Sequence, residues 1–244
     1  MKYFSLKNRI GNLLPGWFTR PFVKYIMPAI RPIERFFYRG INYSKDFYEN
    51  EYHSDIFKLE ERSYDEIINE WEKEGFKREL VDMLNDFSKS IAANGNWLEV
   101  GCMHGRTVWW LYELYPDMKY YMFDFSERAI EWINKNNPIP DGTIVWEGDI
   151  CDITHKDESF NNYFDYITCI DVTEHLPTDV HRQGIREMFR VLKPGGFLFL
   201  RQGISVFPEH INVLSESQLV SDFEEAGFVL SEELPNRYHV FTKT

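Results

Sequence analysis

The sequence has little cysteine and no long apolar run, and both features narrow its class. Three cysteines are present, Cys102, Cys151 and Cys169, among 244 residues. Their odd number and irregular spacing fit neither a disulfide framework nor a zinc site. No run approaches the roughly 20 apolar residues that span a bilayer, and the opening residues lack the apolar core of a signal peptide. We therefore expect a cytoplasmic protein.

Positive charge is also scarce, except in one segment. The net charge is −12, from 27 Lys and Arg against 39 Asp and Glu. Residues 1–40 carry eight cations and one acid, whereas the rest of the chain carries 19 cations and 38 acids. An acidic body argues against a nucleic-acid partner, because the phosphate backbone selects for positive charge. We therefore expect no nucleic acid among the partners.

Residues 1–40 combine basic, aromatic and proline residues, and two interpretations stay open. Interleaved aromatic groups and cations are typical of segments that lie in a membrane interface. On that interpretation the protein is peripheral on the inner face of a membrane. Alternatively, the segment caps the acidic body or makes an oligomer contact. The prolines forbid a long regular helix in either case; they are Pro15, Pro21, Pro28 and Pro32.

The remaining residues divide at about position 95. Apolar residues recur at helical spacing over 63–71 and 76–91, so 41–95 is predicted to form a helical cap. From 96 to 244 strand-like and helix-like patterns alternate, which is typical of a doubly wound α/β sheet. Ser126 could cap a helix that begins at Glu127, and an apolar strand is predicted to begin at Phe197 after the turn Lys193-Pro-Gly-Gly196. The last two predicted strands lie near 228–230 and 238–241.

The first strand of this domain runs into a glycine turn. An apolar run that includes Trp97 and Leu98 is followed by Gly101 and Gly105, and a helix-like pattern begins at Thr107. Glycine suits such a turn because it tolerates positive φ and lets the backbone approach a ligand. The turn is neither the GxGxxG of dinucleotide enzymes nor a GxxxxGK[ST] phosphate loop. It predicts a ligand at the carboxyl end of this strand.

Three acids end three predicted strands at intervals of 25 residues: Glu99, Asp124 and Asp149. In a doubly wound sheet the carboxyl ends of the strands open on one crevice, where ligands bind. An acid after the second strand can bind ribose hydroxyls, and one after the third can accept from an exocyclic amine. Each acid alone could simply cap the next helix. Three in register with a glycine turn favour a nucleoside-like ligand.

With these motifs in order, the chain from about Trp97 onward resembles the class I S-adenosylmethionine-dependent methyltransferases, in particular small-molecule enzymes with a Glu-His pair after the fourth strand, here Glu174-His175. The family fold is a Rossmann-like seven-stranded sheet whose last strand is antiparallel. The segments that carry the resemblance are Leu98-Glu-Val-Gly-Cys-Met-His-Gly105, Phe123-Asp-Phe-Ser126, Glu147-Gly-Asp-Ile150, residues 164–177, and Glu187-Met-Phe-Arg-Val-Leu-Lys-Pro-Gly-Gly196.

The resemblance implies S-adenosyl-L-methionine as the cofactor and assigns residues to it. Asp124 would hold the ribose hydroxyls with Phe125 beside the adenine, and backbone near Ile170 would face the amino group of the cofactor. Met103 stands where the family usually has glycine, so its side chain must point away or reshape the pocket. Asp149 would meet the adenine amine and Ile150 would pack on the ring. The loop that would border the methionine part comprises Glu99, Gly101, Cys102, Met103 and Gly105.

The implied reaction is in-line transfer of a methyl group to a small-molecule or lipid-linked acceptor, with oxygen as the expected nucleophile. An oxygen must lose a proton, and His175 is the leading candidate base because histidine titrates near neutral pH. Asp171 could instead contact the cofactor, and His175 could order its own loop. Four further residues could line the acceptor pocket: Tyr48, Tyr52, His53 and His210.

Two absences complete the prediction. The chain lacks the Asn/Asp-Pro-Pro-Tyr motif that related enzymes use on nucleic-acid bases and protein amides, which again argues against a nucleic-acid acceptor. No set of acids stands out as a metal site, so no divalent ion is expected. Two alternatives stay open, a non-catalytic relative that binds the cofactor and a peripheral membrane scaffold.

Overall fold

A computed structural model describes residues 61–136, 139–156, 158–203, 210–234 and 238–244. The predicted segment 1–40 and positions 41–60 of the predicted cap lie outside the described residues, as do the candidates Tyr48, Tyr52 and His53. None of the helices in the described part of the chain is long and apolar enough to cross a membrane.

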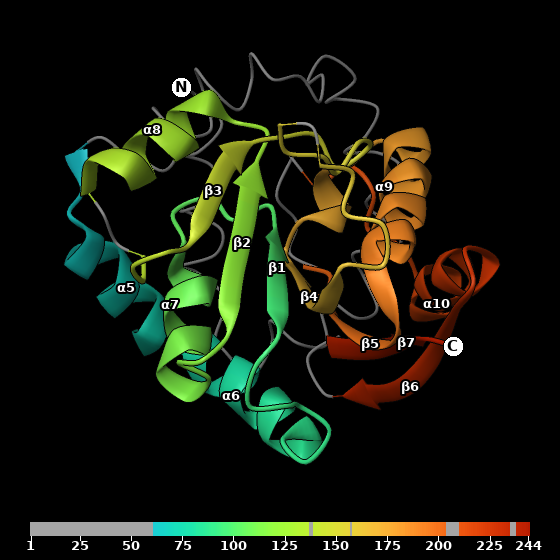
Figure 1. The fold of residues 1–244 in the computed structure, drawn as a ribbon. Helices are drawn as coiled ribbons and strands as arrows, with labels where there is room; N and C mark the ends of the chain where they lie inside the picture. Colours follow the sequence, from blue (N-terminus) through green and yellow to red (C-terminus); the bar gives the residue numbers. More distant parts are fainter. Residues whose placement is uncertain (1–60, 137–138, 157, 204–209, 235–237) are drawn as a thin grey trace, which may run out of the picture.

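The described residues form a seven-stranded sheet in the order β3-β2-β1-β4-β5-β7-β6. Strands β1 to β5 pair in parallel, and β7 is antiparallel to both of its neighbours. This confirms the predicted Rossmann-like sheet with an antiparallel last strand (Figure 1). The strands are β1 (Asn96–Val100), β2 (Lys119–Asp124), β3 (Ile144–Glu147), β4 (Phe164–Ile170), β5 (Leu192–Arg201), β6 (Phe228–Leu234) and β7 (Tyr238–Lys243).

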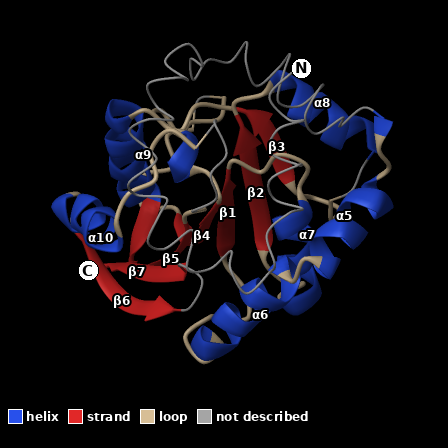
Figure 2. Cartoon of the chain, turned by 180° about the vertical axis from the view of Figure 1, so that it is seen from behind, coloured by secondary structure: helices blue, strands red, loops and turns tan. Residues whose placement is uncertain are grey.

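Helices cover both faces of the sheet (Figures 1 and 2). The first four share one hydrophobic cluster with one sheet face, and the last two share another cluster with the opposite face. A short 3-10 turn, η4 (Thr173–His175), follows β4. The helices are α5 (Tyr64–Lys73), α6 (Phe76–Phe87), α7 (Arg106–Leu114), α8 (Glu127–Asn136), α9 (Thr178–Val191) and α10 (Glu216–Glu225).

Local sequence explains where these helices begin. Ser63 and Glu66 form a capping box at α5, in which each side chain accepts from the backbone of the other. The hydroxyl of Ser126 accepts from the backbone N–H of Ala129 at 3.1 Å and so caps α8, as the sequence predicts. Ser215 caps α10 in the same way.

The core explains why the strands are apolar on both faces. Trp97, in the central strand β1, is fully buried and stacks on Phe199 with ring centroids 5.7 Å apart. Its neighbour Leu98 points to the opposite face and joins the cluster under α9. Because helices cover both faces, successive residues of a parallel strand are buried alternately by different helices. Replacing Trp97 by alanine would cost about 3–5 kcal/mol.

Two details differ from the sequence-based expectation. The described part of the predicted cap, α5 and α6, packs in the same cluster as α7 and β1, so it is part of the helical layer on that face. Strand β5 starts at Leu192, whereas Phe197 was the expected start, because the Lys193-Pro-Gly-Gly196 turn pairs alongside β4 through an irregularity in register. The sequence did not indicate this strand start, because proline and glycine are uncommon inside a central strand.

Candidate functional site

The strand order reverses between β1 and β4, since the chain runs outward to β3 and then returns to the other side of β1. Ligands of doubly wound sheets bind in the crevice at this reversal, beyond the carboxyl ends of the strands. The predicted site residues follow β1, β2, β3 and β4 at that edge. The structure therefore places their backbone along one edge of the sheet.

The turn after β1 requires its glycines. Gly101 has φ +70° and Gly105 has φ +78°. A Cβ on Gly101 would lie 2.5 Å from Cγ2 of Val172, so only glycine fits beside the β4 loop. Met103, between them, also takes a positive φ, +47°. The departure from the family glycine thus leaves the turn conformation in place and stores strain at that residue.

Asp124, at the end of β2, ties this turn to the next helix. Its carboxylate is buried and accepts from the backbone N–H of Met103 at 2.8 Å and from that of Ser126 at 3.0 Å. Each oxygen accepts one of these bonds, and a carboxylate oxygen can accept two. The predicted contact with ribose hydroxyls is compatible with this arrangement. Phe125, the predicted adenine neighbour, is half-buried beside it.

Glu99, at the end of β1, is fully buried, and its environment changes its charge. Burial raises the pKa of its carboxyl from 4.5 to about 8, although hydrogen bonds from Thr168 and Thr107 and the positive Arg106 act against this shift. The hydroxyl of Thr168 donates to one carboxyl oxygen. A carboxyl group with this pKa is mostly neutral at pH 7. Glu99 therefore supports the loop as a hydrogen-bonding group more than as a charge.

The loop after β3 carries the two predicted adenine contacts, Asp149 and Ile150, which differ in their exposure to solvent. Asp149 is exposed, and its carboxylate accepts from the backbone N–H of Cys151 at 2.8 Å. Ile150 is buried against α9, where a Cβ on Gly184 would lie 2.8 Å from Cγ1 of Ile150. Its contact with an adenine ring stays a prediction. Gly184 is required by this close approach of helix and loop.

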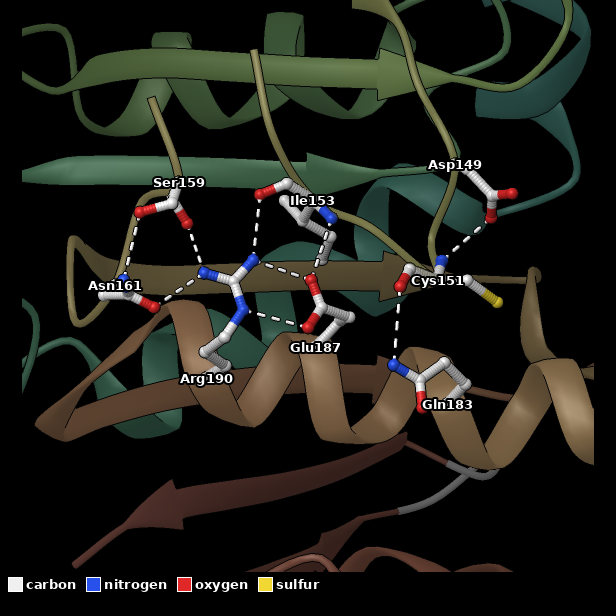
Figure 3. A network of polar contacts seen from close by, with 8 residues as sticks. All are labelled: Asp149, Cys151, Ile153, Ser159, Asn161, Gln183, Glu187 and Arg190. Carbon is white, nitrogen blue, oxygen red and sulfur yellow. Dashed lines mark hydrogen bonds and ion pairs between the residues drawn. The ribbon is translucent and has the colours of Figure 1, made fainter. Parts of the chain in front are cut away.

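A polar network that the sequence analysis missed holds this loop on α9 (Figure 3). Glu187 accepts from the backbone N–H of Ile153 at 2.9 Å and pairs with Arg190 at 2.6 Å. Arg190 also donates to the carbonyl of Ile153 at 3.1 Å and to the side chain of Asn161 at 2.8 Å. Arg190 thus forms hydrogen bonds with an early residue, Ile153, and a late residue, Asn161, of the same loop. The sequence does contain a signal for the Glu187–Arg190 ion pair, because oppositely charged residues three positions apart on a helix are neighbours.

Asp171 follows β4, and its environment is strongly polar. It takes φ +57°, its N–H donates to the carbonyl of Arg201 at 3.0 Å, and its Oδ2 pairs with the guanidinium of Arg201. The other carboxylate oxygen, Oδ1, is buried and has no hydrogen-bond partner among the described residues. Ile170, just before it, packs beside the hydrophobic cluster of β1.

Glu174 and His175, the Glu-His pair of the sequence analysis, lie on η4. Glu174 is fully buried, and burial together with the charge of Asp171 raises the pKa of its carboxyl well above the ordinary value. Its Oε1 accepts from the N–H of Gly203 at 2.7 Å. The ring of His175 lies edge-on to that of His210, with centroids 4.6 Å apart. The structure therefore brings together two residues that the sequence separates by a strand and a helix.

The residues around the β1 and β2 ends fit an S-adenosylmethionine molecule in two ways. Gly101 and Gly105 give the turn after β1 its positive φ angles and let its backbone lie close to Val172 and Ile139, since a Cβ at either glycine would lie within 3.0 Å of one of these side chains. The Asp124 carboxylate lies at the end of the adjacent strand, where the backbone N–H groups of Met103 and Ser126 hold it in a fixed orientation. When bound, this cofactor supplies a methyl group on a sulfonium, and the protein orients it and excludes water. The fold and these residues define a class I methyltransferase.

Comparisons with known proteins agree with this class. Residues 71–233 match a family model described as a methyltransferase domain, so the chain belongs to that family. It is an S-adenosylmethionine-dependent methyltransferase. The PH0226 protein of Pyrococcus horikoshii has the same fold, with a TM-score of 0.60 and 19% identity over 80% of this chain and 99% of that one. A TehB-like methyltransferase of Corynebacterium glutamicum gives a TM-score of 0.54 at 16% identity, over 74% and 96%.

Curated relatives point to two kinds of acceptor. A tRNA N(3)-methylcytidine methyltransferase of Schizosaccharomyces pombe is 30% identical over 66% of this chain and 65% of its own length. A tRNA N(3)-cytidine methyltransferase of Bos taurus is 33% identical over 48% and 32%. O-methyltransferase 3 of Dictyostelium discoideum is 29% identical over 56% and 30%. The chain thus spans between about a third and two thirds of the length of these relatives.

These relatives overturn the predicted partners. The sequence analysis excluded nucleic acid, expected a small-molecule or lipid-linked acceptor and left membrane contact open, yet several similar proteins are named for activity on tRNA. The argument failed because net charge describes the whole surface, whereas a nucleic acid contacts only part of it. The absence of the Asn/Asp-Pro-Pro-Tyr motif also did not justify excluding nucleic acid, because this motif is only one way in which an enzyme can hold a base.

Proposed function

We propose that this chain methylates RNA, and that the acceptor atom is N3 of a cytidine in tRNA. The observation that carries the proposal is the similarity to tRNA N(3)-cytidine methyltransferases of fission yeast and cattle, at 30–33% identity. One O-methyltransferase also matches, over 30% of its own length. Transfer to a hydroxyl is therefore the alternative that the experiment must separate.

Asp171 supports a cytosine acceptor. Its buried Oδ1 has no partner among the described residues, while its Oδ2 is held by Arg201. Cytosine carries a donor amine at C4, next to N3, whereas uracil carries an acceptor there, and carboxylates read cytosine through this amine. A fixed, buried acceptor beside the crevice would favour cytosine and would leave an unpaired oxygen opposite uracil. Asp171 is then a specificity residue.

The chemistry at N3 also changes the role assigned to His175. The lone pair of cytosine N3 lies in the ring plane and carries no proton, so methyl transfer to it needs alignment and no general base. Transfer to a hydroxyl does require a base, and its rate would follow the titration of that base. A rate that is flat between pH 6.5 and 8.5 is therefore expected for N3.

The test is methyl transfer from labelled S-adenosylmethionine to unmodified tRNA transcripts, followed by digestion and mass spectrometry of the nucleosides. The proposal predicts 3-methylcytidine, its loss when the target cytidine is changed to uridine, and reduced discrimination between the two bases in Asp171→Asn. Methyl groups found only on hydroxyls, or turnover only with small-molecule acceptors, would overturn it. The Asp124→Asn variant, weakened in cofactor binding, is the control for contaminating activity.

A further inference from the structure

Two loops meet beyond the carboxyl ends of β4 and β5, and their contact is built by side chains. The amide of Gln202 donates to the hydroxyl of Thr173 at 3.2 Å and to the carbonyl of Asn212 at 3.3 Å. The N–H of Asn212 in turn donates to the carbonyl of Glu174 at 2.8 Å. The turn η4 and the segment around position 212 are therefore fixed against one another.

This contact assembles two imidazoles and a carboxylate. Glu174, His175 and His210 each offer one ligand atom, and these atoms all lie within 4.8 Å of one another. The two histidines are half-buried and Glu174 is fully buried. Ligands 2.0–2.1 Å from a tetrahedral zinc ion are about 3.4 Å apart, so closure by about an ångström would complete such a site.

An independent observation points to a missing ligand here. Oε2 of Glu174 is buried and has no hydrogen-bond partner among the described residues, although Oε1 accepts from Gly203. A carboxylate oxygen left unpaired away from water costs free energy and is rare unless an ion or ligand completes it. Gly203 is required for this arrangement, because a Cβ there would lie 2.2 Å from Oε1 of Glu174. The backbone is thus shaped to hold this carboxylate in place.

We propose that Glu174, His175 and His210 bind one divalent transition-metal ion that joins the loop after β4 to the loop after β5. This departs from the expectation of no metal ion stated above, because that expectation considered acids close in sequence and His210 lies 36 positions from Glu174. Neither the RNA acceptor nor the position of the methyl group enters the argument.

The donor set selects the metal. Imidazole nitrogen suits zinc, iron, cobalt and nickel, whereas magnesium and calcium prefer oxygen ligands. Three protein ligands leave at least one coordination position for water or another group. A zinc-class ion therefore fits better than magnesium.

A second cluster provides a matched control. Glu216, Glu233 and His239 also lie within the same distance of one another, but both carboxylates there are exposed. Exposed acids are well hydrated and seldom hold an ion alone. The Glu233→Gln variant dismantles that cluster at the surface and leaves the proposed site intact. The His210→Ala variant removes a ligand on a half-exposed segment, so it should keep the fold.

The experiment uses the untagged full chain, stripped with chelator and titrated with zinc and with cobalt, with magnesium as a third arm. We expect one equivalent of zinc per chain, cobalt absorption bands of a nitrogen and oxygen site, and a rise in Tm on adding zinc. Glu233→Gln should behave like the wild type. His210→Ala and His175→Ala should bind at least tenfold more weakly and lose the rise in Tm.

Three results would overturn the proposal. The first is binding that Glu233→Gln abolishes, which would assign the ion to the surface cluster. The second is zinc affinity that His175→Ala and His210→Ala leave unchanged. The third is no binding of zinc or cobalt by folded wild-type protein. Circular dichroism of each variant confirms folding, and Glu174→Gln, which keeps an acceptor for Gly203, tests the carboxylate separately.

Discussion

The two sides of the crevice differ in how their buried carboxylates are satisfied. On the cofactor side, at the ends of β1, β2 and β3, each oxygen of Asp124 accepts a backbone N–H, and Arg190, which pairs with Glu187, bonds Ile153, Ser159 and Asn161 in the loop after β3. On the acceptor side, at the ends of β4 and β5, two buried carboxylate oxygens have no hydrogen-bond partner among the described residues: Asp171 Oδ1 and Glu174 Oε2.

This difference shows which side is complete without a ligand. Each buried polar atom without a partner costs about 1–3 kcal/mol, and native proteins keep few of them. Buried polar atoms without partners on one side of a crevice are consistent with groups that are positioned to bind a substrate or an ion. The cofactor side is preorganised by its own backbone, whereas the acceptor side depends on what it binds. Four predictions test this contrast.

The largest effect is expected where the cofactor side is most densely bonded. Arg190→Met removes every bond of the guanidinium and leaves Glu187 without its ion pair (Figure 3). We expect a loss of about 3 kcal/mol in the free energy of unfolding, measured by urea denaturation. Arg186→Met is the control, because Arg186 is exposed and its guanidinium donates to the side chain of Gln183 on the same helix. Equal losses in both variants would contradict the role of the network.

Asp124→Asn should weaken S-adenosylmethionine about 100-fold, or about 2.7 kcal/mol in binding free energy. An amide has one acceptor oxygen, so one of the N–H groups of Met103 and Ser126 loses its partner and the turn shifts. Calorimetric titration measures the change. Asp149→Asn, on an exposed acid, should change the affinity less than tenfold. Similar losses in the two variants would show that Asp124 has no special position.

Glu99 predicts a dependence of stability on pH. Its pKa is about 8 in the folded chain, against an ordinary value of 4.5 in the unfolded chain, so the folded chain keeps a proton that the unfolded chain releases. Stability of the wild type therefore falls as pH rises from about 4.5 to 8. Glu99→Gln removes this loss, and its stability relative to the wild type should rise by up to about 1.4 kcal/mol per pH unit.

Urea denaturation at pH 5, 6, 7 and 8 measures this difference, with Glu127→Gln as an exposed control on α8. The control should stay parallel to the wild type at every pH. A constant difference between Glu99→Gln and the wild type over this range would mean that Glu99 is ionised in the folded chain.

The smallest effect concerns Met103 in the glycine turn. Its φ of +47° is strained for a residue with a Cβ. Met103→Gly and Met103→Ala both remove the side chain, so their difference isolates the backbone conformation. The glycine variant should be more stable than the alanine variant by about 1 kcal/mol, the reverse of their order in a helix. Thermal unfolding decides this, and a more stable alanine variant would show that the turn is unstrained.

Local sequence predicted the strands and the acids at their ends on the cofactor side, but it did not predict the side-chain network around Arg190. Apolar strands that end in Glu99, Asp124 and Asp149 are visible one after another, and the doubly wound class followed from the alternation of strand and helix. The seven-stranded sheet with its antiparallel last strand came from the family resemblance and was confirmed by the structure. The roles of these residues toward the cofactor stay predictions. The start of β5 was missed because proline and glycine rarely open a central strand.

The acceptor side could not be predicted in the same way. His175 and His210 belong to different loops, and their rings meet only because β4 and β5 are neighbours in the sheet. The separation of His175 and His210 in the sequence does not predict that their rings are in contact. The similarity to proteins that act on tRNA was also not anticipated, because net charge describes the surface as a whole. Groups that converge from separate loops require the three-dimensional structure.

The most direct test of this division is a calorimetric titration of S-adenosylhomocysteine into the wild type, Asp124→Asn and His210→Ala. The account predicts that Asp124→Asn weakens binding about 100-fold, whereas His210→Ala stays within about twofold of the wild type, which is under 0.5 kcal/mol. Comparable weakening in the two variants would contradict the separation of a cofactor side from an acceptor side, and so would unchanged binding in Asp124→Asn.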